Sequence, residues 1–362
     1  MTNPARDDRA WIGTRKGLVE MHRRGATWQV ARTHFVGDPV TMTLPPAGPD
    51  RPMLAALNLG HYGAKLHLSE DEGATWTEVD APAYPPQPEG APGPAWKLLQ
   101  VWALEHADGA VWAGTLPGGL FRSADGGRHW SLVDSLWRRP EREQWMGGGN
   151  DAPALHSICP HPCRPGELLV AISCGGAWKT CDGGQSWALS ARGMRADFMP
   201  PELAYDQNAQ DPHRIVRCAA APEVLWCQHH GGIWRSTDGG ANWHEVKAPR
   251  SSFGFAVAVH PQDPDTAWFV PAVNDELRIP VGGALVVNRT RDGGKSFETL
   301  TTGLPQQDCF DLVYRHGLDV SADGRTLMMG STTGHLWASG DGGDSWQMVA
   351  AHLAPVGTVR LG

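Results

Sequence analysis

Residues 236–243 read STDGGANW, and this stretch decides the fold because close copies of it recur along the chain. Each copy, called here an acidic turn, has a Ser or Thr, an Asp two residues later, Gly and a closing aromatic residue. The first copy, at 22–28, has Arg23 in place of the Asp. The closing aromatic residues recur about every 53 residues, which marks one structural unit. They are Trp28, Trp76, Trp130, Trp187, Trp243, Phe297 and Trp346.

Each residue type in the acidic turn has a structural purpose. The Ser or Thr hydroxyl and the Asp carboxylate can bond backbone N–H groups of the turn, and Gly supplies the positive φ that a tight reversal needs. The aromatic ring plugs inward between neighbouring units. Repeated hairpins require such carboxylates in every unit, so we interpret Asp238 and its equivalents as structural rather than catalytic groups.

Strand signals surround each acidic turn. In the sixth unit, apolar segments at 255–259, 266–270, 284–289 and 296–300 predict four short strands, which make one propeller blade. The chain opens at 11–14 with a match to a second strand and closes at 356–360 with a match to a first strand. We therefore predict an all-β, seven-bladed propeller of four-stranded antiparallel blades, in which the C-terminal strand completes the N-terminal blade. Residues 11–362 are expected to form this single domain, after a disordered tail at 1–10.

The acidic turn resembles the Asp-box, or bacterial neuraminidase repeat (BNR), and the resemblance extends over residues 11–360. The chain is thereby similar to WD40/YVTN/BNR-like repeat proteins and to the sialidase-like superfamily. That superfamily includes sialidases, xyloglucan-degrading enzymes, sortilin-type receptors and photosystem assembly factors, so the resemblance implies a fold without selecting a function. Exo-sialidase activity is not expected. Sialidases have six blades and carry an Arg-Ile-Pro motif before the first box, whereas Arg278-Ile279-Pro280 lies in the sixth unit here.

The amino-acid composition indicates the fold class, the kinds of partner and the cellular compartment. The 362 residues include 44 Gly, 29 Pro and 17 Trp, a turn-rich composition suited to a closed all-β domain. A net charge of −8 without a Lys/Arg run argues against a nucleic-acid partner. The sequence has neither a hydrophobic signal core nor an apolar segment of membrane length, so no membrane association is expected. Seven Cys, an odd number, fit reduced thiols. These features predict a cytoplasmic protein.

Functional residues are expected on the face opposite the acidic turns, where loops between second and third strands meet the segments that enter each blade. The stretch Gln228-His229-His230 lies on such a loop. Adjacent residues of a strand point to opposite sides, so one of the two His should face the central funnel. The longest entry segments, 136–155 and 193–213, are predicted to form a lid.

Polar side chains on these loops define a candidate ligand site. The predicted catalytic residues are His156, His230 and Arg315. The predicted substrate-binding residues are Trp96, Lys97, Asn150, Gln228, Arg278 and Asp311. The candidate ligands of a divalent metal, Zn, Mn, Fe or Cu, are His156, His213, His229 and His230. An alternative without metal holds an anion on Arg315 and Lys97, with His156 as acid or base.

A second stretch is ligand-like in composition only. Cys159, His161 and Cys163 stand close together in CPHPC, as metal ligands often do. They fall, however, where the sixth unit has the strand-end turn that begins at His260. We interpret CPHPC as a turn with free thiols.

Two functional interpretations remain. In the favoured one, the protein is an enzyme that binds and transforms a small polar molecule, anionic or sugar-like, by glycosidase-like or metal-dependent hydrolase or lyase chemistry. In the alternative it is a non-catalytic scaffold or assembly factor with a protein partner, because the sequence contains no recognised catalytic motif.

Overall fold

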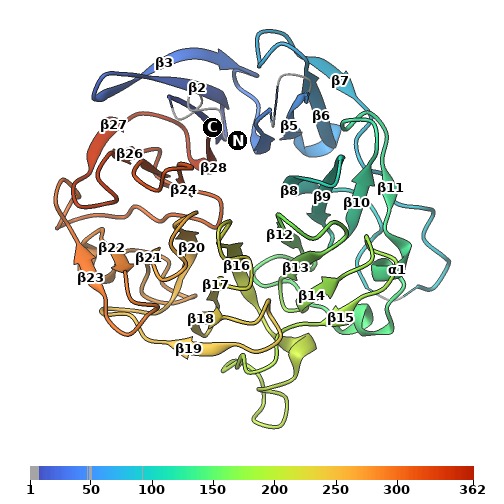
Figure 1. Cartoon of the computed structure of the whole chain (residues 1–362). Helices are drawn as coiled ribbons and strands as arrows, with labels where there is room; N and C mark the ends of the chain where they lie inside the picture. The colour runs from blue at the N-terminus through green and yellow to red at the C-terminus, as the bar shows by residue number, and fades with distance from the viewer. Residues whose placement is uncertain (1–7, 47, 49–50, 92) are drawn as a thin grey trace. The chain divides into compact units, whose positions relative to one another are not determined.

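The computed structural model describes residues 8–46, 48, 51–91 and 93–362 (Figure 1). These residues form seven four-stranded antiparallel sheets, and the fold is a seven-bladed β-propeller, as predicted. The first strand begins at Arg9, and residues 1–7 of the predicted tail lie outside the described residues. The α-helix α1 (Asp134–Trp137) has four residues, and no helix in the described part of the chain has the length and apolarity needed to span a bilayer.

Close packing divides the chain into two compact units. The first contains Met1–Val40, Val216–Gly239 and His244–Gly362. It contains three complete blades. Blade 1 consists of β28 (Val356–Leu361), β1 (Arg9–Thr14), β2 (Gly17–Arg24) and β3 (Thr27–His34). Blade 6 consists of β20 (Gly254–Val259), β21 (Ala267–Pro271), β22 (Val287–Thr290) and β23 (Glu298–Leu300), and blade 7 consists of β24 (Leu318–Val320), β25 (Leu327–Gly330), β26 (Leu336–Ser339) and β27 (Gln347–Ala350). The 3-10 helix η4 (Val281–Gly283) precedes β22.

The second unit contains Thr41–Ile215 and Gly240–Trp243. Its strands form three blades. Blade 2 consists of β4 (Val40–Leu44), β5 (Met53–Asn58), β6 (Ala64–Ser69) and β7 (Thr77–Val79). Blade 3 consists of β8 (Gln100–Ala107), β9 (Ala110–Leu116), β10 (Leu120–Ser123) and β11 (Ser131–Leu132), and blade 4 consists of β12 (Leu155–Pro160), β13 (Leu168–Ile172), β14 (Gly176–Thr180) and β15 (Ala188–Leu189). Its 3-10 helices are η1 (Gly60–Tyr62), η2 (Pro140–Gln144) and η3 (Gln207–Ala209).

Blade 5 is one hydrogen-bonded sheet whose first strand runs across the boundary between the two units. It consists of β16 (Pro212–Arg217), β17 (Leu225–His229), β18 (Gly232–Ser236) and β19 (His244–Val246).

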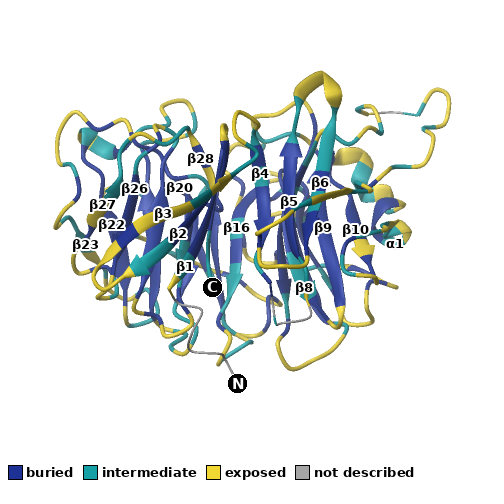
Figure 2. Cartoon of the chain, turned by 90° about the horizontal axis from the view of Figure 1, so that it is seen from above, coloured by how far each residue is buried: buried dark blue, intermediate teal, exposed yellow. Residues whose placement is uncertain are grey.

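Within each blade the outermost strand is the least buried. Strands β1, β13, β17 and β21 are buried along almost their whole length, whereas the outer strands β3, β19 and β23 are largely exposed or half-buried. Figure 2 shows this gradient between β1 and β3. The closing aromatic residues pack inward, as predicted. Trp243, for example, is 2% exposed, and its Nε1–H donates to the backbone oxygen of Ser190 at 2.8 Å. Ser190 directly follows β15, the last strand of blade 4. The hydrophobic core thus lies along the inner strands and between consecutive blades.

The C-terminal strand completes blade 1, as predicted. β28 pairs antiparallel with β1, from Ala10 opposite Leu361 to Thr14 opposite Val356. On its other side, Val359 N–H donates to His316 O, before β24, at 2.7 Å. The last strand is therefore bonded both to the first strand of the chain and to blade 7.

The acidic turns have the geometry that their sequence predicts. In blade 2, the backbone N–H of Gly73 donates to Ser69 Oγ at 2.8 Å, and the N–H of Thr75 donates to Asp71 Oδ1 at 2.8 Å. The same hydroxyl and carboxylate positions recur in the turns closed by Trp130, Trp187, Phe297 and Trp346. The repeated Asp residues consequently serve the backbone of the turns.

These turns should make the fold sensitive to acid. The pKa of Asp71, Asp182 and Asp292 falls to about 2, chiefly because a Ser or Thr four residues later donates its hydroxyl to the carboxylate. A carboxyl group whose pKa is lowered by folding stabilises the fold above its unfolded pKa of about 3.9, and this stabilisation is lost as the pH falls through the folded value. We expect the melting temperature to decline between about pH 4 and pH 2.

Circular dichroism melts from pH 2 to pH 6 measure this effect. An Asp182→Asn, Asp292→Asn variant should melt below the wild type at pH 6 and close to it at pH 2. A wild-type melting temperature that stays constant across the interval would contradict the assignment.

Candidate metal centre

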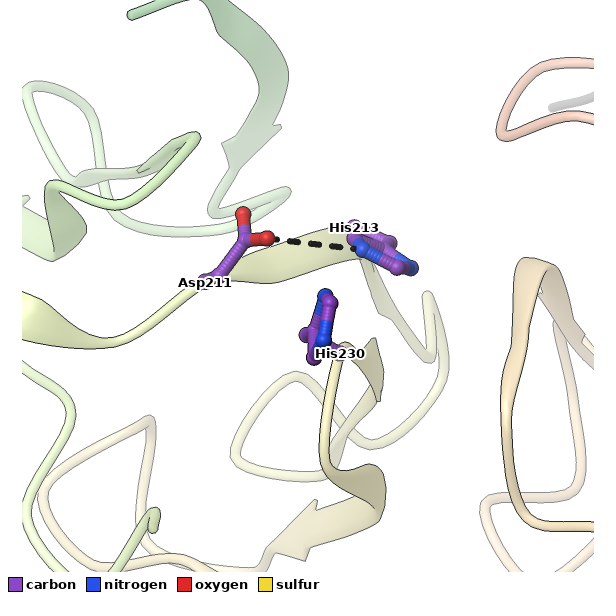
Figure 3. Close-up of side chains that lie close together, drawn as sticks. All are labelled: Asp211, His213 and His230. Carbon is purple, nitrogen blue, oxygen red and sulfur yellow. Dashed lines mark ion pairs between the residues drawn. The ribbon is translucent and has the colours of Figure 1, made fainter. Parts of the chain in front are cut away.

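Two imidazoles and one carboxylate converge in blade 5 (Figure 3). Asp211 directly precedes β16, His213 lies on β16, and His230 directly follows β17, the neighbouring strand of the same sheet. Their ligand atoms all lie within 4.8 Å of one another, and His213 Nε2 is 3.5 Å from Asp211 Oδ2. Two ligands at 2.0–2.2 Å from a tetrahedral ion are about 3.4 Å apart. The Asp211–His213 pair therefore already has the separation that a metal ion requires.

Strand geometry explains why these residues meet. Asp211 and His213 are two residues apart, so their side chains project from the same face of the extended chain. At the end of β17, His229 turns into the blade, where its Nδ1 accepts the N–H of Gly231 at 2.9 Å. His230 belongs to the cluster instead. The two adjacent His therefore have different environments, and His230 is the one with a candidate chemical role.

Gln228 holds the loop that carries His230. Its Nε2 donates to Ser252 O at 2.8 Å and to Gly232 O at 3.1 Å, and the residue is 1% exposed. The amide that the sequence suggested for substrate binding is thus engaged in bonds that connect the β17–β18 turn with the segment before β20. We assign Gln228 a positioning role for His230.

Backbone groups orient the Asp211 carboxylate. The N–H of Cys174 donates to Asp211 Oδ1 at 3.2 Å, and Cys174 adopts φ 40°, a left-handed conformation uncommon outside glycine. Gly148 approaches the other oxygen so closely that a Cβ there would lie 2.9 Å from Oδ2. Groups behind a metal ligand fix its direction and tune its basicity. Because Asp211 and His213 are 1% and 2% exposed while His230 is half-buried, the cluster is accessible mainly at His230.

A largely buried cluster of aromatic and cationic side chains extends from His230. The ring of Phe253 meets His230 edge-on at 5.7 Å and Phe255 at 5.3 Å. The guanidinium groups of Arg278 and Arg315 lie over the Phe255 ring, at 5.6 Å and 5.4 Å from its centre. The structure thereby connects three residues predicted from the sequence, His230, Arg278 and Arg315, through two Phe rings. Two guanidinium groups therefore lie over the same aromatic ring.

Neighbouring polar groups keep the Arg278 guanidinium positively charged. Arg278 donates to Asp275 Oδ1 at 2.5 Å. Burial acts to lower the pKa of Arg278, but hydrogen bonding to Tyr314 and the charge of Asp275 outweigh it and raise the pKa. The guanidinium is therefore a permanent positive charge.

Asp311, another predicted substrate-binding residue, belongs to a separate network in blade 7. Its Oδ1 accepts the Ser331 hydroxyl at 2.6 Å and lies 2.7 Å from His335 Nδ1, while the Cys309 thiol donates to Oδ2 at 3.1 Å. Thr333 also donates to Oδ1. Burial raises the pKa of the Cys309 thiol to about 12, so this thiol stays protonated. Asp311 joins the segment before β24 to the β25–β26 loop.

The remaining predicted residues lie elsewhere. His156 is buried on β12, with Nδ1 3.3 Å from Ser157 Oγ and its ring edge-on to Trp102. Among the described residues, the cluster around Asp211 includes neither His156 nor His229. Lys97 and Asn150 are exposed on entry segments. Sequence reasoning missed Asp211, although its spacing of two residues from His213 was a usable signal.

The CPHPC stretch forms a strand-end turn, as predicted. His161 Nδ1 accepts the N–H groups of Cys163 and Arg164 at 3.1 Å and 3.0 Å. His260 accepts two backbone N–H groups in the same way in blade 6. The imidazole caps the turn in both blades, and all seven cysteines have free thiols.

Comparison with known proteins identifies the class as β-propeller. No family model and no curated protein matches the chain. Among solved structures, it is similar to the GH74 xyloglucanase from Xanthomonas campestris, with a TM-score of 0.65 and 18% identity over 96% of this chain and 53% of that one. An ancestral GH74 enzyme matches with a TM-score of 0.58 and 15% identity, over 91% of this chain and 37% of that one. This chain thus spans about half or less of the two glycoside hydrolases.

Two further structures are similar over most of their own length. YCF48 bound to D1 peptide has a TM-score of 0.56 and 16% identity, over 92% of this chain and 90% of that one. A putative 6-phosphogluconolactonase from Bacteroides fragilis NCTC 9343 has a TM-score of 0.58 and 8% identity, over the full length of both chains. At such identities the likeness shows the shared fold alone, because one propeller fold serves many functions.

Proposed function

We propose that this protein is a metal-dependent enzyme of the Asp-box, sialidase-like propeller superfamily that transforms a small anionic molecule. The observation that carries the proposal is the cluster of Asp211, His213 and His230, two imidazoles and a carboxylate from one sheet. Such a ligand set suits Zn²⁺, Fe²⁺ or Mn²⁺. Seven free thiols support a reducing, cytoplasmic location.

In this proposal different residues would hold the metal and bind the substrate. A divalent metal with three protein ligands supplies a Lewis acid and an open position for water or substrate. Cys174 and Gly148 hold the direction of the Asp211 carboxylate. Arg278 and Arg315, beyond the two Phe rings, provide the charge that would bind a carboxylate or phosphate of the substrate.

A second candidate function is peptide binding without catalysis. Its support is the likeness to YCF48 bound to D1 peptide, which this chain matches over 90% of that protein's length. A protein of this kind would have no need of a metal. The metal content therefore separates the two candidates.

Elemental analysis of the untagged protein, before and after incubation with Zn²⁺, Mn²⁺ or anaerobic Fe²⁺ and desalting, tests the proposal. We expect about one ion per chain, since the chain offers one such cluster in its described residues. Loaded and chelated protein are then compared on esters, lactones and glycosides that carry a carboxylate or phosphate. Turnover by the loaded form alone supports the enzyme. Absence of bound metal refutes the metal centre, and stoichiometric metal without turnover refutes the enzymatic role.

A further inference from the structure

A pocket lies in the unit Thr41–Ile215, and it shares no residue with the candidate metal centre. Three stretches of chain form it: the segment before β8, the turn between β9 and β10, and the segment from α1 to β12. The last of these is the entry segment predicted as a lid. Three Trp, three Pro and two Gly line the pocket together with Arg142 and Glu143. Rings and small aliphatic surfaces therefore make up most of its wall.

The Arg142 guanidinium is stacked on the tryptophans. It lies 3.9 Å from the centre of the Trp137 ring and 5.3 Å from that of Trp96, and the two rings meet edge-on at 5.2 Å. Stacking on an aromatic face holds a guanidinium in place while its N–H groups remain available in the plane. This cation is thus positioned by rings rather than by an acid.

Arg142 differs in this respect from its neighbours. Arg139 donates to both oxygens of Glu141, at 3.0 Å and 2.6 Å, and Arg138 pairs with Asp134 at 3.3 Å. Within the described residues, no acceptor is hydrogen-bonded to the side chain of Arg142. Burial lowers the pKa of Arg142, which indicates a guanidinium partly withdrawn from water. A half-buried cation without a bonded acid favours an anion.

Three of the lining residues carry an indole N–H group. Trp137 is 4% exposed, and its indole N–H has no hydrogen-bond partner among the described residues; the same holds for the buried indole N–H of Trp96. In contrast, the N–H of Trp145 donates to Asn208 Oδ1 at 2.8 Å. The lining is therefore rich in aromatic faces, and Glu143 is its single acid.

We propose that this pocket binds a small organic anion in which a carboxylate is attached to a ring. The carboxylate accepts hydrogen bonds from Arg142, whose planar fork matches two carboxylate oxygens. The ring packs against the indole faces. A monoanion fits better than a phosphate dianion, because the lining contains one Arg and one Glu. The site stands independently of the proposed function, since the two clusters have no residue in common.

Saturation-transfer NMR titrations with matched probes test the proposal: benzoate against benzyl alcohol, and glucuronate against glucose. The carboxylates should bind, and each should bind at least about 10-fold tighter than its uncharged counterpart, because a hydrogen bond to a charged group is worth about 1.5–3 kcal/mol. Arg142→Gln should remove this preference. The control Arg138→Gln, at an exposed ion pair, should leave it unchanged.

Trp137→Leu should weaken the binding of both the charged and the uncharged probe of each pair, provided that the variant still melts cooperatively. If the variant does not fold, Arg142→Gln tests the proposal independently. Equal binding of charged and uncharged probes would identify a neutral ring pocket and overturn the proposal. Failure of the wild type to bind either carboxylate at millimolar concentration would overturn it as well.

Discussion

Removal of residues 354–362 is expected to abolish cooperative folding. The deletion takes away β28, which pairs with β1 and also bonds to the segment before β24. It removes Val356 and Val359, 2% and 1% exposed, and burial of such a side chain contributes about 1.5–3 kcal/mol. It also leaves both neighbours with unpaired backbone groups. Because a whole domain is stable by only about 5–15 kcal/mol, the loss is a large share of the total.

Thermal and urea unfolding followed by circular dichroism measure this effect. A circular permutant that starts at residue 354 and joins residue 361 to residue 9 through a short linker is the matched control, because Gly362 N–H already contacts Arg9 O at 3.2 Å. The permutant retains β28 and should melt cooperatively. A truncated protein with an unchanged melting temperature would refute the structural role assigned to the last strand.

Replacement of the clustered His residues should abolish tight metal binding. Loss of a residue that merely supports a ligand costs about 10- to 100-fold in metal affinity, so loss of the ligands in His213→Gln, His230→Gln should cost more than about 100-fold. Asp211→Asn keeps an oxygen for the Cys174 N–H and removes the charge, which isolates the carboxylate's contribution. Competition of Zn²⁺ with a chelating dye measures these affinities.

His335→Gln is the control for this series. His335 also faces a carboxylate, Asp311, at 2.7 Å, but the cluster of three potential ligands found in the described residues lies at Asp211. Its replacement should leave metal affinity unchanged. Equal Zn²⁺ affinity of the wild type and the double His variant would place any bound ion elsewhere.

The course of the chain through its blades was predictable from residues close together in sequence. An acidic turn is closed by hydrogen bonds spanning four residues, such as Ser69 with Gly73. Each turn therefore has the same structure wherever it recurs, and the spacing of turns predicts the strands between them. Even the closure by β28 could be inferred, because the chain begins with a second strand and ends with a first strand.

The candidate site depends on contacts between residues distant in sequence. His230 lies near Asp211 only because β17 pairs with β16. The turn after β17, which Gln228 holds by hydrogen bonds, decides that His230 rather than His229 joins the cluster. Its position on a predicted innermost strand ranked His156 with these residues, yet the fold buries it in blade 4.

By itself, the sequence determined the all-β class, the number of blades, the structural role of the acidic turns and the closing strand, because each follows from local hydrogen bonds repeated at a regular interval. Tertiary structure alone decided that Asp211 joins His213 and His230 in a cluster able to hold a metal ion, and that Arg142 lies over two Trp rings. The physical reason is that side-chain chemistry of this kind needs convergence within a few ångströms. Strand pairing and loop packing supply that convergence, and no spacing along the chain records it.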